Sequence, residues 1–224
     1  IVLNREGECL RSWGEGYFAR AHGARRALDG SLFCTDDIAN VVAKFSLDGD
    51  LLMQMGKKGE SSHTGYQHAW DLWQAVGTVT HAGPPFNRPT GVAEGPDGDI
   101  YVSDGYGNAC VHRFDSKGDL KYSWGEPGGR PGQFRLPHDI ALDSKGRLLV
   151  ADRENSRVQL FDTEGKYLEE WNDVIRPTGI SFDSVGNVYI SELAMRVAVF
   201  TPDGNLLGRW GNTTIDQDSA LFHA

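Results

Sequence analysis

The 224-residue sequence lacks several features that would assign it to a familiar class at once. No stretch approaches the roughly 18 consecutive apolar residues of a membrane span, and no local cluster of Lys and Arg stands out. Asp and Glu number 31 against 22 Lys and Arg, which gives a formal net charge of −9. Because such a surface repels phosphate backbones and anionic lipids, neither nucleic acid nor a membrane is an expected partner.

Cysteine is also scarce. Cys9, Cys34 and Cys110 are an odd number at wide spacing with no CxxC pair, so they predict neither a disulfide framework nor a zinc knuckle. Each lies beside apolar residues in a strand-like run, and we expect buried free thiols. No targeting segment is recognisable, but the chain begins in a strand-like run, so the compartment and the oligomeric state stay open.

Glycine, in contrast, is abundant: 28 of the 224 residues are glycine, or one in eight, whereas the usual share is about 7%. One series of glycines has an apolar residue four positions earlier and Trp or Met six positions later, and a second series precedes it by 18 to 20 residues. The first series is Gly7, Gly49, Gly118, Gly165 and Gly204, and the second is Gly30, Gly98, Gly146 and Gly186. Each repeat therefore holds two hairpins, or four strands, over about 40 residues. This pattern predicts an all-β β-propeller of four-stranded antiparallel blades.

The repeats divide the chain into one propeller domain. They predict four complete blades at residues 18–56, 86–125, 134–171 and 174–211, with partial blades at 1–13 and 218–224. From Gly49 to Gly118 the spacing is 69 residues, whereas the other spacings in this series are 39 to 47. The extra residues in this spacing indicate an inserted loop at 60–85, which carries Trp70 and Trp73. A loop this long is often functional, and a loop packed on its neighbours by those aromatics is the alternative.

The start of each innermost strand should face the central channel. One equivalent position there alternates between His and Thr along the chain: His22, Thr90, His138 and Thr178. Histidines on alternate blades suit a three-histidine metal site with one open position, and hydrogen-bonded wall residues are the alternative. The third histidine would follow Ala224, where the next repeat stops two residues short of this position. We expect Thr90, Thr178, Trp70 and Trp73 to contact a substrate.

The loops after the second strands should surround the same channel. An acidic residue recurs there in all four blades, which indicates a structural task, namely accepting hydrogen bonds from backbone N–H groups. Tyr106 and Arg153 do not recur, so maintenance of the repeat does not explain them. An arginine beside a phenol favours the phenolate, which would suit Tyr106 to general-base work. Ordinary surface polarity is the alternative for either residue.

At residues 88–93, 102–108, 136–138 and 150–155 the chain resembles the NHL-repeat propellers. More closely, it resembles the catalytic core of peptidyl-α-hydroxyglycine α-amidating lyase and its bacterial relatives. The resemblance implies a six-bladed ring whose channel zinc is held by three histidines, two of them matched by His22 and His138. It also implies that Tyr106 is the base, that Arg153 supports it, and that a structural calcium lies partly on the backbone near Ala24. The chain departs from the animal members at Gly107, where they carry a cysteine.

These observations lead to one hypothesis with two alternatives. The hypothesis is a zinc-dependent lyase-like enzyme that acts at the channel mouth on a small molecule or peptide, by a reaction resembling the cleavage of peptidyl-α-hydroxyglycine to an amide and glyoxylate. A non-enzymatic NHL propeller would instead bind a protein or small ligand on the same face. A lactonase-type propeller hydrolase is the third reading, and the histidines in register count against it.

Overall fold

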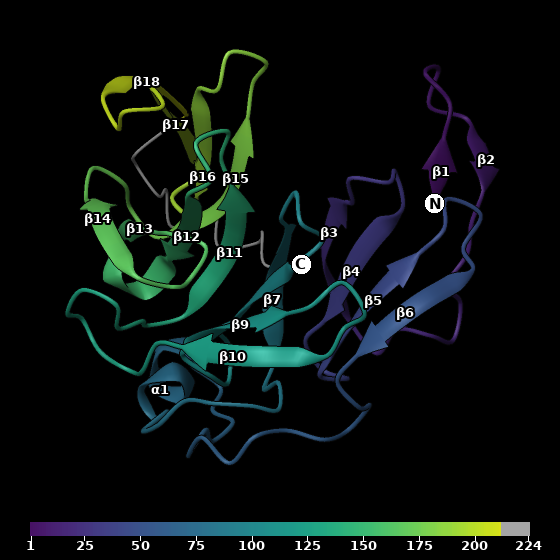
Figure 1. Ribbon diagram of the computed structural model, residues 1–224, viewed down its shortest axis with the longest axis horizontal. Helices are drawn as coiled ribbons and strands as arrows, with labels where there is room; N and C mark the ends of the chain where they lie inside the picture. Colours follow the sequence, from purple (N-terminus) through teal and green to yellow (C-terminus); the bar gives the residue numbers. More distant parts are fainter. Residues whose placement is uncertain (212–224) are drawn as a thin grey trace.

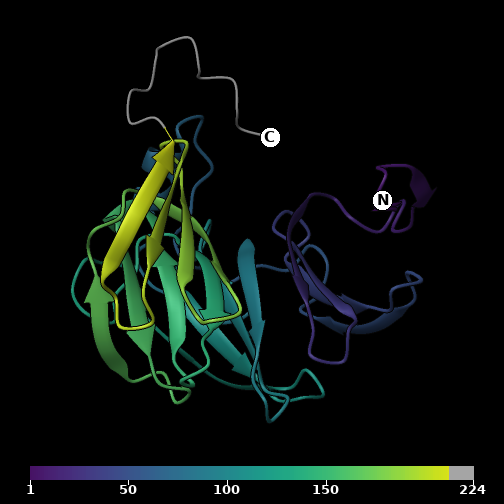
Figure 2. The ribbon, with the colours of Figure 1, turned by 90° about the horizontal axis from the view of Figure 1, so that it is seen from above.

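Four sheets of four antiparallel strands, each formed by consecutive strands, make up most of the protein. The structure is a computed structural model that describes residues 1–211. The sheets consist of β3 (Ala21–Arg26), β4 (Leu32–Asp36), β5 (Val41–Phe45) and β6 (Leu51–Met55); β7 (Pro89–Glu94), β8 (Ile100–Asp104), β9 (Cys110–Phe114) and β10 (Leu120–Trp124); β11 (Pro137–Leu142), β12 (Leu148–Asp152), β13 (Arg157–Phe161) and β14 (Tyr167–Trp171); and β15 (Pro177–Phe182), β16 (Val188–Glu192), β17 (Arg196–Phe200) and β18 (Leu206–Gly211). Figures 1 and 2 show these sheets side by side around a common centre, which confirms the predicted all-β propeller with four complete blades.

The first strand of each blade is the innermost one, because β3, β7, β11 and β15 contact one another in that order. Apolar residues fill the space between adjacent blades. Between the second and third sheets, for instance, Tyr101 packs in one cluster with Leu148 and Phe161, all of them fully buried. This packing holds the inner strands rigidly around the channel.

A hairpin of β1 (Val2–Leu3) and β2 (Cys9–Arg11) precedes the first complete blade. It leaves Cys9 exposed, so the expectation of a buried thiol was wrong there, whereas Cys34 and Cys110 are buried free thiols as expected. The predicted partial blade at 218–224 lies outside the described residues, and the six-bladed ring stays a prediction.

The offset between the repeating glycines and tryptophans has a packing explanation. Gly165 has φ +78°, and a Cβ there would lie 2.7 Å from a ring carbon of Trp124 in the preceding blade. At Gly204, with φ +82°, a Cβ would lie 2.4 Å from the indole nitrogen of Trp171. The outer hairpin of one blade therefore receives the tryptophan of the blade before it, and only glycine meets both the backbone and the space requirement.

The recurring acidic residue performs the expected structural task. Its carboxylate accepts a hydrogen bond from the backbone N–H of the segment that leads into the innermost strand of the same blade. The pairs are Asp36 with Ala19 and Arg20, Asp104 with Asn87, Asp152 with Arg135, and Glu192 with Ile175. These bonds fix the place where each inner strand begins.

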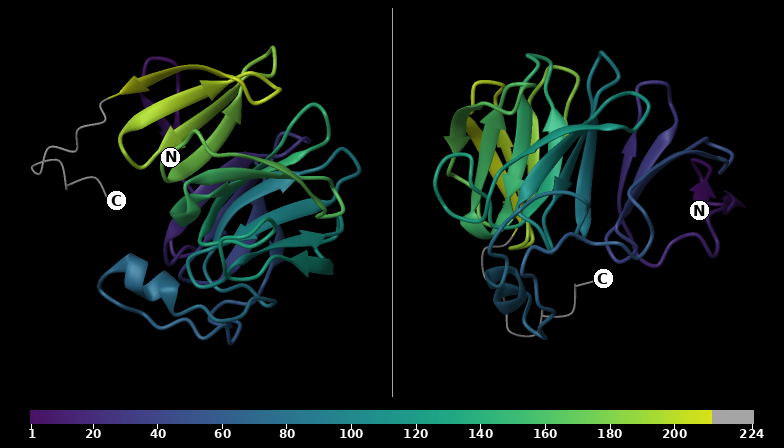
Figure 3. Two further views of the ribbon diagram at one scale, coloured as in Figure 1. Left: turned by 90° about the vertical axis from the view of Figure 1, so that its left-hand side faces the viewer. Right: turned by 60° about the horizontal axis from the view of Figure 1, so that its bottom comes forward.

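The insertion at 60–85 carries a helix that the sequence did not reveal, α1 (Leu72–Gly77). Asp71 caps it by accepting a 2.8 Å hydrogen bond from the Trp73 N–H, and its Ala75 and Val76 are buried. Figure 3 shows the insertion beside the ends of the blades, with α1 projecting from them. Within residues 1–211 no helix has the length and apolar character needed to cross a membrane.

Candidate functional site

One cavity of about 1390 Å³ lies at the channel mouth, lined by residues from all four complete blades and from the insertion. The eight site residues proposed from the sequence all line it: His22, Trp70, Trp73, Thr90, Tyr106, His138, Arg153 and Thr178. They come from segments far apart in the chain, and the radial arrangement of the blades is what brings them together.

The alternating His and Thr positions are β-bulges. In β11 the register shifts between Pro137 and Asp139, so His138 is the extra residue on the innermost strand. His22 occupies the same bulge in β3, and Thr90 and Thr178 occupy it in β7 and β15. Bulges re-aim side chains and are frequent next to active sites. Here each bulge puts its side chain on the cavity wall.

Tyr106 lies between the two histidines. Its phenol oxygen is 3.3 Å from Nε2 of His22 and 3.0 Å from Nε2 of His138. The two imidazole centroids are 5.0 Å apart. Tyr106 comes from the loop between β8 and β9, so three separate blades contribute to this cluster.

Backbone carbonyls set the orientation of both imidazoles. Nδ1 of His22 is 3.0 Å from the carbonyl oxygen of Thr90, and Nδ1 of His138 is 2.7 Å from that of Thr178. A carbonyl can only accept, so each Nδ1 must donate its proton, and in the neutral ring Nε2 then presents a lone pair to the cavity. The two threonines thus act on the site through their backbone.

The phenol has a single proton, and two Nε2 lone pairs face its oxygen. It can donate to only one of them, which leaves the other available to a cation. Burial, together with the positive charge of Arg153 and the neighbouring His22, lowers the pKa of His138 to about 3. His138 is therefore neutral at ordinary pH, which is the state that binds a metal. Two neutral imidazoles of this kind would fit a metal such as zinc, for which His22 and His138 would supply two ligands.

Two arginines cover the ring of Tyr106. The guanidinium carbon of Arg153 is 5.5 Å from the ring centroid, and that of Arg88 is 5.0 Å away. Arg153 is buried and pairs with Glu154 through Nε, at 2.9 Å. Its Nη2 is buried and has no hydrogen-bond partner among the described residues. Arg153 thus presents an unsatisfied donor at the cavity wall.

Sequence reasoning missed the charged residues that surround this cluster. Arg88 donates to Asp37 and, at 2.6 Å, to the hydroxyl of Tyr66 in the insertion. Arg20 also pairs with Asp37. Burial raises the pKa of Asp37, but the hydrogen bonds from the two arginines outweigh it and the net shift is downward. Asp37 therefore stays ionised and holds both guanidinium groups at the cavity.

A signal for these arginines was present in the sequence. Arg20, Arg88 and Arg176 each stand immediately before an innermost strand, so their equivalence could have been read from the repeat. Arg176 pairs with Glu154 at 2.6 Å, and its Nε is buried without a partner among the described residues. Deeper in the channel, Arg25 pairs with Asp139 at 3.1 Å across two blades.

The residues proposed to contact a substrate differ in exposure and in whether their polar groups already have hydrogen-bond partners. The hydroxyl of Thr90 is buried within hydrogen-bonding distance of the carbonyl oxygens of Ser103 and Pro137, and that of Thr178 lies 3.1 Å from the carbonyl oxygen of Ser191. Trp70 is fully exposed and Trp73 is half exposed at the cavity rim. The tryptophans are therefore free to meet a ligand, whereas the threonine hydroxyls already have partners.

Comparison with known proteins identifies the repeats. A family model described as the NHL repeat matches residues 86–114 and 134–161. The chain is 30% identical over 221 residues to human NHL repeat-containing protein 3. The matched region covers 92% of this chain and 53% of that protein. Over 175 residues it is 36% identical to the peptidylglycine alpha-amidating monooxygenase of Rattus norvegicus, covering 74% of this chain and 16% of that protein.

A third relative is the probable peptidyl-alpha-hydroxyglycine alpha-amidating lyase pgal-1 of Caenorhabditis elegans. It is 29% identical over 228 residues, covering 99% of this chain and 56% of that protein. Among solved structures, a streptogramin B lyase superposes with a TM-score of 0.65 at 18% identity, over 95% of this chain and 61% of that one. The chain thus spans about half or less of the length of these three relatives.

Proposed function

We propose that this chain, an NHL-repeat β-propeller homologous to the peptidylglycine amidating enzymes, is a metal-dependent lyase that breaks the C–N bond of a peptidyl-α-hydroxyglycine. The observation that carries the proposal is the cluster at the channel mouth. There, one phenol oxygen lies within 3.3 Å of two imidazole nitrogens and under two guanidinium groups. A phenol oxygen in this position can act as a general base in a pocket lined by cations.

The charge of the cavity supports an anionic substrate. The chain as a whole has a net charge of −9, yet five arginines line this one cavity: Arg20, Arg25, Arg88, Arg153 and Arg176. Arg153 and Arg176 each keep a buried N–H without a partner among the described residues. The five arginines outnumber the carboxylates of Asp37, Asp139 and Glu154 that pair with them. The two free donors of Arg153 and Arg176 therefore suit a carboxylate, and an α-hydroxyglycine terminus carries one.

In the proposed reaction, Tyr106 transfers the proton and two arginines supply positive charge. The Tyr106 oxygen, as phenolate, takes the proton of the substrate's α-hydroxyl. The electrons of that O–H bond form the C=O of glyoxylate as the C–N bond breaks. The proton then passes from Tyr106 to the departing amide nitrogen. Arg88 and Arg153 place positive charge over the Tyr106 ring, and the buried walls keep their field strong during the proton transfer.

His22 and His138 would hold the metal through Nε2. When bound, a zinc ion supplies Lewis-acid polarisation of the substrate's α-hydroxyl, which makes that hydroxyl more acidic. The carbonyls of Thr90 and Thr178 keep both imidazoles in the tautomer that this requires, as outer partners of metal-binding histidines do.

The test is turnover of a peptide that ends in α-hydroxyglycine, followed by the release of glyoxylate above the rate without protein. Wild type should release it, and Tyr106→Phe should lose at least about 100-fold in rate, as expected for removal of a general base. Tyr189→Phe, at a residue that does not line the cavity, is the matched control and should match wild type. The absence of turnover by wild type, or full activity in Tyr106→Phe, contradicts the proposal.

A further inference from the structure

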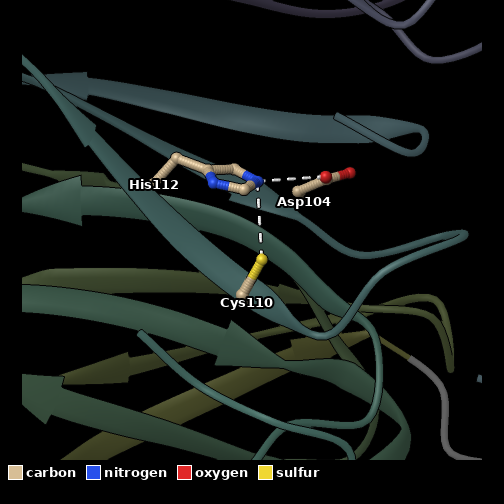
Figure 4. Close-up of side chains that lie close together, drawn as sticks. All are labelled: Asp104, Cys110 and His112. Atoms are coloured by element: carbon tan, nitrogen blue, oxygen red, sulfur yellow. Dashed lines mark hydrogen bonds and ion pairs between the residues drawn. The ribbon is translucent and has the colours of Figure 1, made fainter. Parts of the chain in front are cut away.

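A second group of metal-ligating side chains lies on the second sheet (β7–β10), away from the channel cavity. Asp104 at the end of β8 and Cys110 and His112 on β9 each offer one donor atom, and the three atoms lie within 4.8 Å of one another (Figure 4). The imidazole Nε2 is 3.4 Å from the Cys110 sulfur and 3.2 Å from Oδ2 of Asp104. All three side chains are buried, and none lines the channel cavity.

The equivalent position in the neighbouring blade shows what is unusual here. In the strand register, Cys110 lies opposite Asp104, just as Arg157 lies opposite Asp152 in the next blade. His112 is the equivalent of Gln159 in that blade. In that blade the Arg157 guanidinium donates to the carboxylate at 2.8 Å and neutralises it. In the second sheet, cysteine replaces the arginine and no Lys or Arg pairs with Asp104 within residues 1–211.

The Asp104 carboxylate is therefore a buried charge without a fixed cation. One oxygen, Oδ2, accepts from the Asn87 N–H and the Asn108 amide, at 2.7 and 2.8 Å. The other oxygen, Oδ1, is buried and has no partner among the described residues. A buried carboxylate is costly unless it is paired, and Oδ1 is an acceptor left free for a cation.

The histidine is oriented as a metal ligand would be. Its Nδ1 lies 2.7 Å from the Ser123 hydroxyl oxygen, to which it can donate, and Nε2 then presents its lone pair toward the sulfur and the carboxylate. A hydrogen bond at the far ring nitrogen is the usual outer partner of a metal-bound histidine.

From this arrangement we infer that Asp104, Cys110 and His112 bind a structural divalent cation of the zinc class. Sulfur, imidazole and carboxylate are the ligands that zinc takes in proteins. The thiol releases its proton on binding, so a thiolate and a carboxylate balance the charge of the ion inside the fold. The site is independent of the proposed lyase activity.

The position of the site gives the ion a structural task. Asn87, which donates to Asp104, follows the end of the 60–85 insertion. Asn108, which also donates to Asp104, exchanges hydrogen bonds with the backbone of Gly83 at 2.8 and 3.2 Å. An ion on Asp104 would therefore fasten the insertion that carries Trp70 and Trp73 to the second sheet.

Cobalt(II) reports such a site directly, because cobalt bound to a thiolate has a charge-transfer absorption in the near ultraviolet. We expect this band when cobalt is added to the metal-free full chain and also to the double variant His22→Ala/His138→Ala. Cys110→Ser should lack it, and Cys34→Ser, which changes the other buried cysteine, should keep it. The absence of the band in wild type, or its persistence in Cys110→Ser, overturns the inference.

A second pair of variants keeps the test decisive if Cys110→Ser does not fold. His112→Gln installs the residue found in the neighbouring blade, where Gln159 donates to Asp152 at 3.1 Å, so the fold should tolerate it. Zinc should raise the midpoint of thermal unfolding of the His22→Ala/His138→Ala protein and lose that effect when His112→Gln is added. Ser123→Ala should weaken zinc binding by about 10- to 100-fold. An unchanged zinc effect in His112→Gln means that these residues form only a hydrogen-bonded group.

Discussion

Replacing Arg153 with methionine removes a cation from above the Tyr106 ring, and we expect kcat for the α-hydroxyglycine peptide to fall about 100-fold. The substitution keeps much of the side-chain length and removes only the charge and its hydrogen bonds. Arg153 is 2% exposed, so solvent screens its charge little.

The magnitude follows from the distance. A unit charge 5.5 Å from the ring centroid interacts with a negative phenolate by about 3 kcal/mol at an effective dielectric constant of about 20. Each ~1.4 kcal/mol of lost stabilisation is a factor of ten in rate, which gives about two orders of magnitude. Arg88 remains at 5.0 Å in the variant, so activity should be reduced and not abolished.

The assay is the initial rate of glyoxylate release at saturating peptide, with thermal unfolding measured in parallel to show that the variant folds. Arg153→Lys should recover part of the rate because it retains the charge. Arg209→Met, an exposed arginine on β18, is the matched control and should behave as wild type. A folded Arg153→Met protein with a kcat within about threefold of wild type would refute the electrostatic reasoning, since the expected loss is about 100-fold.

Three further predictions concern the scaffold, the rim and the metal. A Cβ at Gly105 would lie 2.1 Å from the carbonyl oxygen of Pro137, so Gly105→Ala should destabilise the fold by about 1–3 kcal/mol. Thermal unfolding checks this. Gly77→Ala is the control, because a Cβ at Gly77 would meet nothing within 4 Å. Trp70 is fully exposed at the cavity rim, so Trp70→Ala should leave the unfolding midpoint unchanged and raise KM for peptides with an apolar residue before the α-hydroxyglycine; an unchanged KM removes Trp70 from substrate binding. The double variant His22→Ala/His138→Ala should hold one zinc per chain fewer than wild type by mass spectrometry, and equal zinc contents would exclude these ligands.

The fold was predictable from the sequence because its repeat is enforced by packing. Three outer-hairpin glycines, Gly49, Gly165 and Gly204, make room for the tryptophan of the blade before, and Gly118 does so for methionine. These residue types therefore had to recur at a fixed offset. The same repeat placed His22 and His138 at equivalent positions. It could not show that these positions are bulges, because a bulge depends on the pairing with the next strand.

Other parts of the site depended on contacts between distant segments. Nothing local to Arg88 indicates that it reaches Tyr66 in the insertion and the ring of Tyr106. The helix of six residues in the insertion was missed, since it is too short to show a helical period. Cys9 was wrongly expected to be buried, because its apolar neighbours lie in a two-stranded sheet that leaves them exposed.

The central claim is that the channel mouth breaks a C–N bond by elimination, and the products formed in ¹⁸O-labelled water test it most directly. Elimination from the peptidyl-α-hydroxyglycine yields the peptide amide, whose oxygen comes from the peptide and stays unlabelled, together with glyoxylate. Hydrolysis of the adjacent peptide bond, between the carbonyl carbon and the same nitrogen, would instead yield a peptide carboxylate that carries one labelled oxygen. We predict the unlabelled amide from wild type, with its formation slowed in Tyr106→Phe. A labelled carboxylate, or no product at all, would contradict the account.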